Sequence, residues 1–258
     1  MELAEYADLM YTMSVHRIKV RYKQSLLGLS WSVLQPLSLM AIYTVIFSFI
    51  MKVPSESVPY VIFSFGGILP WLCFQTSLVT GTTSLVSNTE LIDKVYFPRE
   101  ILPLSCMFAS IFDFLVASSI LGGMMVYYGV SITINIVYVI PIIVILVVFV
   151  SALSLVFSVI QIRFRDVGVA LPLLLQLWMF ATPVVYPLRS VQALPHFWQT
   201  LYVLNPMVGL IENFRRVVVL GHAPHMTSLL VSFLISFSLL PLAYAYFKRT
   251  DAIAADII

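Results

Sequence analysis

Six long apolar stretches divide this chain, and they restrict its possible folds more than any other feature. Each supplies the roughly 20 apolar residues that an α-helix needs to cross a bilayer. Hydrophobic residues make up 60% of the sequence and charged residues only 10%. The mean hydropathy of +1.00 is far above that of a soluble domain. We therefore predict an all-α integral membrane protein, a single domain over residues 1–258, with six transmembrane helices at residues 29–51, 60–86, 101–129, 134–162, 167–188 and 227–247.

Residues 1–28 precede the first apolar stretch and carry a different pattern. Polar side chains recur every three or four residues and would share one face of a helix, at Glu5, Asp8, Thr12, His16, Lys19 and Lys23. This spacing predicts an amphipathic helix that lies in the membrane interface. Arg17 and Arg21 fall toward its apolar side, where long side chains can reach lipid phosphates or an anionic ligand. A plain positively charged anchor explains these residues equally well.

Residues 88–100 form a charged segment between the second and third apolar stretches. Ionised groups are too costly to leave in hydrocarbon, so the segment is expected in water. Pro98 should confine any helix to the part before it, about two turns with Thr89 as the cap. Such a short charged helix suits the docking of another protein, although on charge alone a solvated loop is the simpler explanation. The charges are those of Glu90, Asp93, Lys94, Arg99 and Glu100.

The Lys and Arg residues indicate how the predicted helices are oriented. Ten of the 14 lie in segments on the same side as the N-terminus, and the other four are Lys52, Arg189, Arg215 and Arg216. Because cytoplasmic segments carry the excess of Lys and Arg, we predict six crossings with both termini in the cytoplasm. Asn205 and Pro206 break the outer segment into two pieces that are too short to span. We therefore predict a re-entrant helical pair over residues 192–221.

No catalytic motif appears in the sequence. It contains no GxxxxGK(S/T) nucleotide-binding loop, no HExxH and no GxSxG, and its four His residues are scattered. Cys73 and Cys106 lie inside apolar stretches and lack the spacing of a metal site. We therefore expect a protein that is not an enzyme, holds no metal or cofactor of its own and binds no nucleic acid. The energy for any driven process would come from a partner protein or from an ion gradient.

Asp113 is the one carboxylate deep within a predicted span. An ionisable group at that depth indicates a transport pathway by default. Ser105 and Ala109 precede it at intervals of four residues, and small residues at that spacing let two helices approach closely. The other interpretation is therefore that Asp113 forms a hydrogen bond across a contact between helices. Tyr43 and Phe47 share a helix face that can stack on sugar rings. Aromatic residues also form interfacial belts and fill cores, which is the more common use.

Five strings, taken in order along the chain, resemble one family. They are RYKQSLLGLSWSVLQPL at residues 21–37, YFPREILP at 96–103, RFRDV at 163–167, FATPVVYPL at 180–188 and LNPM at 204–207. Together they resemble the membrane subunit of the ABC-2 type polysaccharide exporters, which move O-antigen, capsule or teichoic acid chains. The likeness covers nearly the whole chain and is nearer to the O-antigen branch than to the capsule branch.

The resemblance implies a homodimeric permease in the bacterial inner membrane, surrounded by membrane lipids and joined to two cytoplasmic ATPase subunits that bind ATP and Mg²⁺. The substrate would be a lipid-linked polysaccharide. The loop between the second and third spans would be a coupling helix that contacts the ATPase through Glu90, Asp93, Lys94, Tyr96, Phe97, Arg99 and Glu100. The interface helix would guard a lateral entry for the substrate headgroup, at Arg17, Lys19 and Arg21.

The outer helical pair would form the exit gate, to which we assign Asn205, Pro206, Glu212, Arg215 and Arg216. We assign the substrate path to Tyr43, Phe47, Asp113 and Tyr186. Two other classes of protein stay open as alternatives. An ion-coupled secondary transporter would use Asp113, and inverted repeats, which would favour it, are not visible. A membrane enzyme acting on lipid-linked sugars would need paired acids or a His cluster at one depth.

Overall fold

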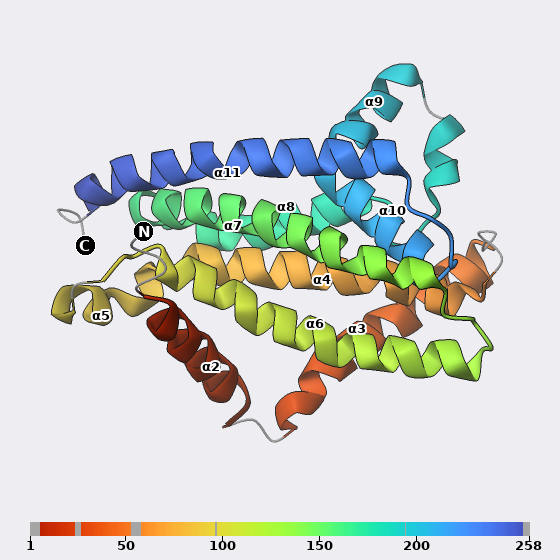
Figure 1. Cartoon of the computed structure of the whole chain (residues 1–258), viewed down its shortest axis with the longest axis horizontal. Helices are drawn as coiled ribbons and strands as arrows, with labels where there is room; N and C mark the ends of the chain where they lie inside the picture. The colour runs from red at the N-terminus through yellow and green to blue at the C-terminus, as the bar shows by residue number, and fades with distance from the viewer. Residues whose placement is uncertain (1–5, 24–26, 53–57, 96, 194, 255–258) are drawn as a thin grey trace.

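The computed structural model describes residues 6–23, 27–52, 58–95, 97–193 and 195–254, and every regular element within these ranges is a helix. The long helices lie roughly side by side along the longest axis of the molecule (Figure 1). Within the described ranges, five helical stretches are long and apolar enough to cross a membrane, namely Gly28–Ile50, Tyr60–Thr83, Ile101–Tyr127, Ile134–Arg163 and Met226–Thr250. The prediction of an all-α membrane protein is confirmed.

The helix α4 (Tyr60–Thr83) forms the centre of the bundle. In the most apolar 18 residues of α4, 78% of the positions are buried inside the molecule. In the corresponding 18 residues of the first span, Gly28–Ile50, only 11% are buried. The helix α4 packs against two long helices, α6 (Ile101–Tyr127) and α7 (Val139–Arg163), and against two shorter ones, α3 (Trp31–Tyr43) and α10 (Pro206–Val218). The sequence pattern therefore located the spans, and the packing separates one central helix from those at the surface.

Aromatic side chains fill the core around α4. Trp71 and Phe74 of α4 are fully buried. Phe74 stacks on Phe149 of α7, with 5.8 Å between the ring centroids. The edge of Trp178 meets Phe74 at 5.3 Å. Aromatic rings in the middle of the bundle thus pack against one another, as the core interpretation of these residues predicted.

The fifth predicted span, residues 167–188, is only partly helical. The helix α8 (Val167–Phe180) has 14 residues, fewer than the other spanning helices. The chain then turns, and Thr182, Pro183, Val184 and Val185 are buried without forming a helix. Pro183 lacks a backbone N–H and disfavours helical angles in the residue before it, which explains why α8 ends there. The expectation of a helix through residue 188 is therefore corrected.

The bundle has two distinct ends (Figure 1). One carries the short helix α5 (Thr89–Lys94), the beginning of α2 (Ala7–Lys23) and the C-terminal end of α11 (Met226–Ala254), and is called the α5 end. The opposite end carries α9 (His196–Leu204) beside α10 and is called the α9 end. The predicted break at Asn205 is confirmed, and its side chain caps α10 by accepting a hydrogen bond from the amide of Met207 at 3.1 Å.

Two shorter elements differ from the sequence prediction in length. The helix α5 covers six residues rather than the two full turns expected up to Phe97. The helix α2 begins at Ala7, and residues 1–5 and 24–26 of the predicted interface helix lie outside the described ranges.

Two of the spans also contain other helix types. A π-helical stretch, Thr44–Ile50, follows α3, and a 3-10 stretch, Ile134–Tyr138, precedes α7.

Candidate functional site

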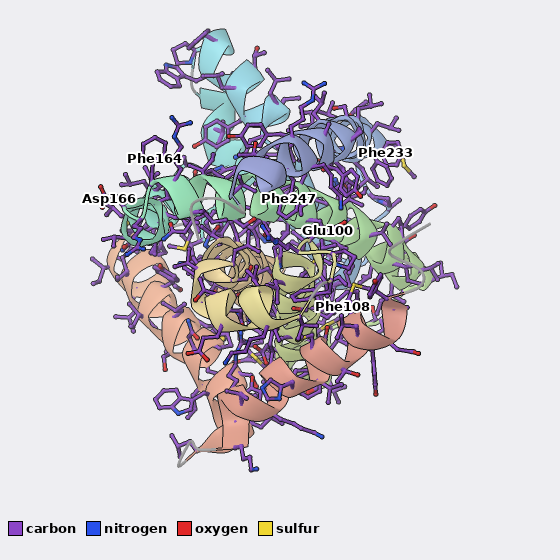
Figure 2. The ribbon with its side chains drawn as sticks, turned by 90° about the vertical axis from the view of Figure 1, so that its left-hand side faces the viewer. Glu100, Phe108, Phe164, Asp166, Phe233 and Phe247 are labelled. Atoms are coloured by element: carbon purple, nitrogen blue, oxygen red, sulfur yellow. The ribbon has the colours of Figure 1, made fainter. Side chains whose placement is uncertain are left out.

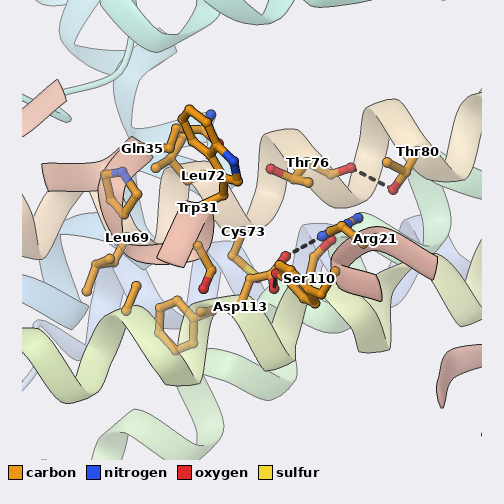
Figure 3. A pocket seen from close by; sticks show the side chains of 15 residues that line it. Arg21, Trp31, Gln35, Leu69, Leu72, Cys73, Thr76, Thr80, Ser110 and Asp113 are labelled. Carbon is orange, nitrogen blue, oxygen red and sulfur yellow. Dashed lines mark hydrogen bonds and ion pairs between the residues drawn. The ribbon is translucent and has the colours of Figure 1, made fainter. Parts of the chain in front are cut away.

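A cavity of about 410 Å³ lies between α2, α3, α4 and α6 (Figure 3). Its wall combines a cation, an anion, an indole ring and a row of hydroxyl groups. The residues that bring these groups are Arg21, Tyr22, Trp31, Gln35, Thr76, Thr80, Ser110 and Asp113. Apolar side chains of α4 and α6 complete the lining. A wall of this composition can bind a ligand that carries both an anionic group and hydroxyl groups.

The charged groups of the cavity contact each other across two helices. Arg21 of α2 forms an ion pair with Asp113 of α6, and the Tyr22 hydroxyl donates a hydrogen bond to the other oxygen of the same carboxylate. Burial, followed by this hydrogen bond, raises the pKa of Tyr22 to about 12, so the phenol stays protonated and able to donate. The side chains of Arg21 and Asp113 remain 31% and 20% exposed. The pair therefore borders the open volume.

Arg17 lies one turn before Arg21 and also turns toward α6. Its Nε donates to the Ser105 hydroxyl at 2.9 Å. Together with Arg21 it lines a second cavity of about 450 Å³. Arg21 and Thr80 border both cavities, so the two are neighbours, and together they are called the groove beneath α2. The two Arg side chains were predicted to reach lipid phosphates or an anionic ligand, with a plain positively charged anchor as the alternative. In the structure both contact α6, whereas Lys19 is exposed.

The residues assigned to the substrate path are not brought together. Tyr43 of α3 places its hydroxyl 3.8 Å from the Met179 sulfur, and the rings of Tyr43 and Phe47 are 6.2 Å apart. Tyr186 donates a hydrogen bond to the carbonyl of Phe180 at 2.9 Å. None of these three lines the cavity that contains Asp113. Of the four residues, Asp113 alone belongs to the candidate site.

Several residues of this site were not predicted from the sequence. Tyr22, Trp31, Gln35, Thr76 and Thr80 were not singled out, although they line the cavity. A usable signal was present, because Thr76 and Thr80 are four residues apart and share a face of an apolar helix. Polar groups at that spacing within a span indicate a face that does not contact lipid.

The expected docking residues separate into exposed and buried groups. Glu90 and Lys94 of α5 are exposed and lie 3.6 Å apart as an ion pair. Phe97 is 6% exposed and Glu100 is 0% exposed. Asp93 lies in α5 and Arg99 is half-buried, while Tyr96 lies outside the described residues.

Phe97 and Glu100 were expected to contact a partner protein, and the structure places both in the interior of this chain. Phe97 packs in a cluster at the α5 end with Leu85, Ile101, Leu102, Leu155, Val159 and Phe247. Glu100 Oε1 lies 2.7 Å from Nζ of Lys248. Both side chains are therefore buried in the chain's own core, and neither is exposed beside α5.

The residues assigned to the outer gate fasten α10 to the segment after α8. Arg215 is 1% exposed and donates hydrogen bonds to the carbonyls of Pro183 at 3.0 Å and Val184 at 2.7 Å. Its guanidinium lies 3.9 Å from the centroid of Phe63. The Asn205 amide donates to Thr182 Oγ1 at 3.1 Å. These contacts satisfy backbone groups that would otherwise be buried without partners.

Two further members of that set lie at the margin of α10. Glu212 is 3.4 Å from Arg215, and Arg216 donates to the carbonyl of Ala223 at 2.5 Å. Gly67 of α4 faces Arg215, and a Cβ atom there would overlap both the Arg215 guanidinium and the Val184 carbonyl. Close packing of this kind holds α10 against α4 and the segment after α8.

The described residues contain no group of three or more His, Cys, Asp or Glu side chains that could hold a metal ion. Cys73 and Cys106 are buried, and both are free thiols. The cavity beneath α2 contains a single carboxylate, which already has two partners. The geometry therefore suits binding and passage of a ligand better than acid–base chemistry.

Comparisons with known proteins agree with a transport role. The chain matches the model of the ABC-2 type transporter family over residues 9–219. The O-antigen export system permease protein RfbA of Myxococcus xanthus is 30% identical over 257 residues, covering 99% of this chain and 98% of that protein. The protein of the same name from Klebsiella pneumoniae is 31% identical over 215 residues, covering 83% of this chain and 81% of that protein.

A more distant relative is the polysialic acid transport protein KpsM of Escherichia coli. It is 23% identical over 236 residues, covering 88% of this chain and 87% of that protein. The family match extends from α2 through α10 and thus includes the cavity, the charged segment with α5 and most of the α9 end. On this extent of similarity and an all-helical membrane fold, the chain belongs to the ABC-2 type transporter family.

Proposed function

We propose that this chain is the permease subunit of an ABC exporter that moves a lipid-linked, O-antigen-like polysaccharide across the inner membrane. It works as a homodimer with two cytoplasmic ATPase subunits, which bind ATP and Mg²⁺. The observation that carries the proposal is the similarity, over 98–99% of both chains, to a permease whose name specifies O-antigen export. The absence of a nucleotide-binding loop from this sequence supports a separate ATPase.

The groove beneath α2 supports an entry site for the substrate headgroup. A lipid-linked glycan joins its lipid to its sugars through anionic phosphate groups. Arg21 offers a guanidinium whose fork suits phosphate, and Thr76 and Thr80 offer hydroxyl groups close by. Trp31 is 54% exposed at the cavity and offers a flat surface for a sugar ring. In this proposal an anionic headgroup takes the place of Asp113 at Arg21.

The exposed charges of α5 support a docking site for the ATPase at this end of the bundle. Glu90 and Lys94 are mostly exposed, and the helix that carries them connects two long spans. The outward apolar surface of the first span, of which only 11% of the most apolar window is buried, supports a second copy of the chain as a neighbour. Lipid would cover whatever part of that surface the second copy leaves free.

The test is export by a strain in which the gene for this chain has been deleted. Surface polysaccharide should disappear and lipid-linked polysaccharide should accumulate on the cytoplasmic side. Restoration should require both this chain and an ATPase with an intact nucleotide-binding Lys. Export that continues after ATP is depleted, and stops when a protonophore is added, would instead identify an ion-coupled transporter. Unchanged surface polysaccharide in the deletion strain would contradict the proposal.

Orientation has its own test. Single Cys residues at positions 3, 92, 200 and 256, in a background without Cys73 and Cys106, would be treated with an impermeant thiol reagent in cells stripped of their outer membrane. Only position 200, on α9, should react, because the excess of Lys and Arg predicts that the other three lie in the cytoplasm. Reaction at position 256 would exclude six crossings.

A further inference from the structure

The helix α11 is the structural connection between the two ends of the bundle. Its 29 residues give it a length of about 43 Å. It runs from the α9 end to the α5 end (Figure 1) and packs along α7 between them. Pro241 lies within it, and the helix continues through this residue. Polar contacts fasten α11 at either end.

At the α5 end, α11 is fastened to the residue that directly precedes α6. Lys248 Nζ lies 2.7 Å from Glu100 Oε1, and the Tyr244 hydroxyl lies 3.4 Å from the same oxygen. Glu100 is fully buried, and among the described residues its Oε2 atom has no hydrogen-bond partner. Figure 2 views the molecule from this end and shows Glu100 and Phe247 close to its centre.

A buried carboxylate of this kind is poorly explained by stability alone. Apolar residues of similar volume often stabilise a protein as much as a buried ion pair does, because both charges must give up their hydration. An ion pair has a directional contact, however, and it fixes how two elements meet. Glu100 comes only six positions after Lys94 at the end of α5, so the pair connects α11 to the charged segment that carries α5.

At the α9 end, a second set of polar contacts fastens α11 to α10. The Asn213 amide donates to Ser228 Oγ at 3.0 Å, and its oxygen accepts from the amide of His225 at 2.6 Å. Ser232 donates to the carbonyl of Pro206 at 3.0 Å. A Cβ atom at Gly209 would lie 2.7 Å from the Ser228 carbonyl oxygen, so the two helices touch backbone to backbone.

We propose that Glu100 and Lys248 are positioning residues, and that α11 transmits movement of the α5 segment to α10 through these two fastenings. The inference rests on the proposed function, because it assumes that an ATPase moves α5. Movement of α5 displaces Glu100, the ion pair carries the displacement to α11, and the contacts of Asn213 and Ser232 carry it to α10. Breaking either set of contacts should lower the amount of glycan exported per ATP hydrolysed, while the ATPase stays bound to the permease.

The experiment uses the full complex of this chain with its ATPase, reconstituted in proteoliposomes, and measures glycan exported per ATP hydrolysed. Lys248→Met should keep ATPase binding and hydrolysis but lower that ratio at least about fivefold, the lower range of typical coupling between sites. Arg249→Met is the matched control, because Arg249 is the adjacent exposed cation of the same helix. It should export at the ratio of the unmodified complex.

Two further variants separate positioning from folding. Glu100→Gln combined with Lys248→Met leaves no unpaired buried charge, so this protein should assemble and should still export poorly per ATP. Asn213→Leu should produce the same defect from the α9 end. Ser238→Ala is its control, because the exposed Ser238 hydroxyl bonds to the Ile235 carbonyl of its own helix.

The proposal is overturned if Lys248→Met, or the double variant, exports with the ratio of Arg249→Met. It is also overturned if neither variant assembles, because the pair is then an element of folding alone. Failure of the proposed function looks different. In that case the unmodified complex itself exports no glycan, whatever the state of Glu100 and Lys248.

Discussion

Arg215 and Arg21 are the same type of residue in two different roles. Arg215 is 1% exposed and donates to two backbone carbonyls, which cannot leave their positions. Arg21 is 31% exposed, and the group it pairs with is the side chain of Asp113, at the edge of a cavity. A ligand can compete with a side chain but hardly with backbone. The contrast indicates that Arg215 belongs to the fold, and it supports the proposal that Arg21 can exchange Asp113 for a ligand.

The largest effect is expected from Arg215→Met. Each buried carbonyl left without a donor costs ~1–3 kcal/mol, and this change removes the donor to two of them together with the contact on Phe63. Thermal unfolding of the purified protein in detergent should show a clearly lower midpoint. Arg216→Met is the matched control, because Arg216 is only half-buried. Equal midpoints for the two variants would remove the distinction between Arg215 and Arg21.

A smaller effect, on export rather than on folding, is expected from Arg21→Gln. One charge near an anionic group is worth about 1 kcal/mol, or about fivefold in affinity. Export should fall by that order while the unfolding midpoint stays close to normal. Replacing Arg17, Lys19 and Arg21 together with Gln should lower export further. If Arg21→Gln lowers the midpoint as much as Arg215→Met does, Arg21 is a structural residue as well.

Variants of Asp113, the ion-pair partner of Arg21, test the same comparison between a structural and an exchangeable contact. Asp113→Asn keeps size and hydrogen bonding, so it should still accept from Tyr22 and should export close to normally. Asp113→Leu removes both acceptors and leaves Arg21 and Tyr22 without partners on α6, which should disturb assembly. Gel filtration and export assays measure the two outcomes. Lost export with intact assembly in the Asn variant would instead show that the negative charge itself acts in transport.

The smallest effect is expected at α5, where both charges are exposed. Glu90→Lys breaks a pair whose side chains are mostly in solvent, and such pairs contribute ~0–1 kcal/mol. The unfolding midpoint should stay close to normal, and the amount of co-purified ATPase should change by no more than about fivefold. Complete loss of the ATPase from this one variant would show that Glu90 is buried in the interface with its partner.

The sequence predicted the helices well and the partners of single side chains poorly. The apolar stretches located all the long spans, and the Asn205–Pro206 pair marked the break before α10, because these signals are local. Phe97 and Glu100 lay in a charged segment and were therefore expected in water. Their partners Phe247 and Lys248 are about 150 residues away in sequence, and no local pattern encodes such contacts.

The candidate site shows the same division. Arg21 and Asp113 were each singled out from the sequence, one by its place on an interface helix and the other by its depth in a span. Their contact joins residues 92 positions apart and was not foreseen. The end of α8 was missed for a related reason. Val184 and its neighbours can leave the helix because Arg215 satisfies their carbonyls, and that compensation comes from another helix.

The shortness of α8 has a consequence for the surrounding lipid. Fourteen residues give it a length of about 21 Å, against ~30 Å for the hydrocarbon core of a typical bilayer. Its outward side chains, among them Val169, Leu173 and Leu177, are exposed and apolar. A bilayer adapts to such a helix by thinning beside it, at a cost of a fraction of a kcal/mol for each Å. Acyl-chain length should therefore act on this protein mainly through α8, and short-chain lipids should accommodate it best.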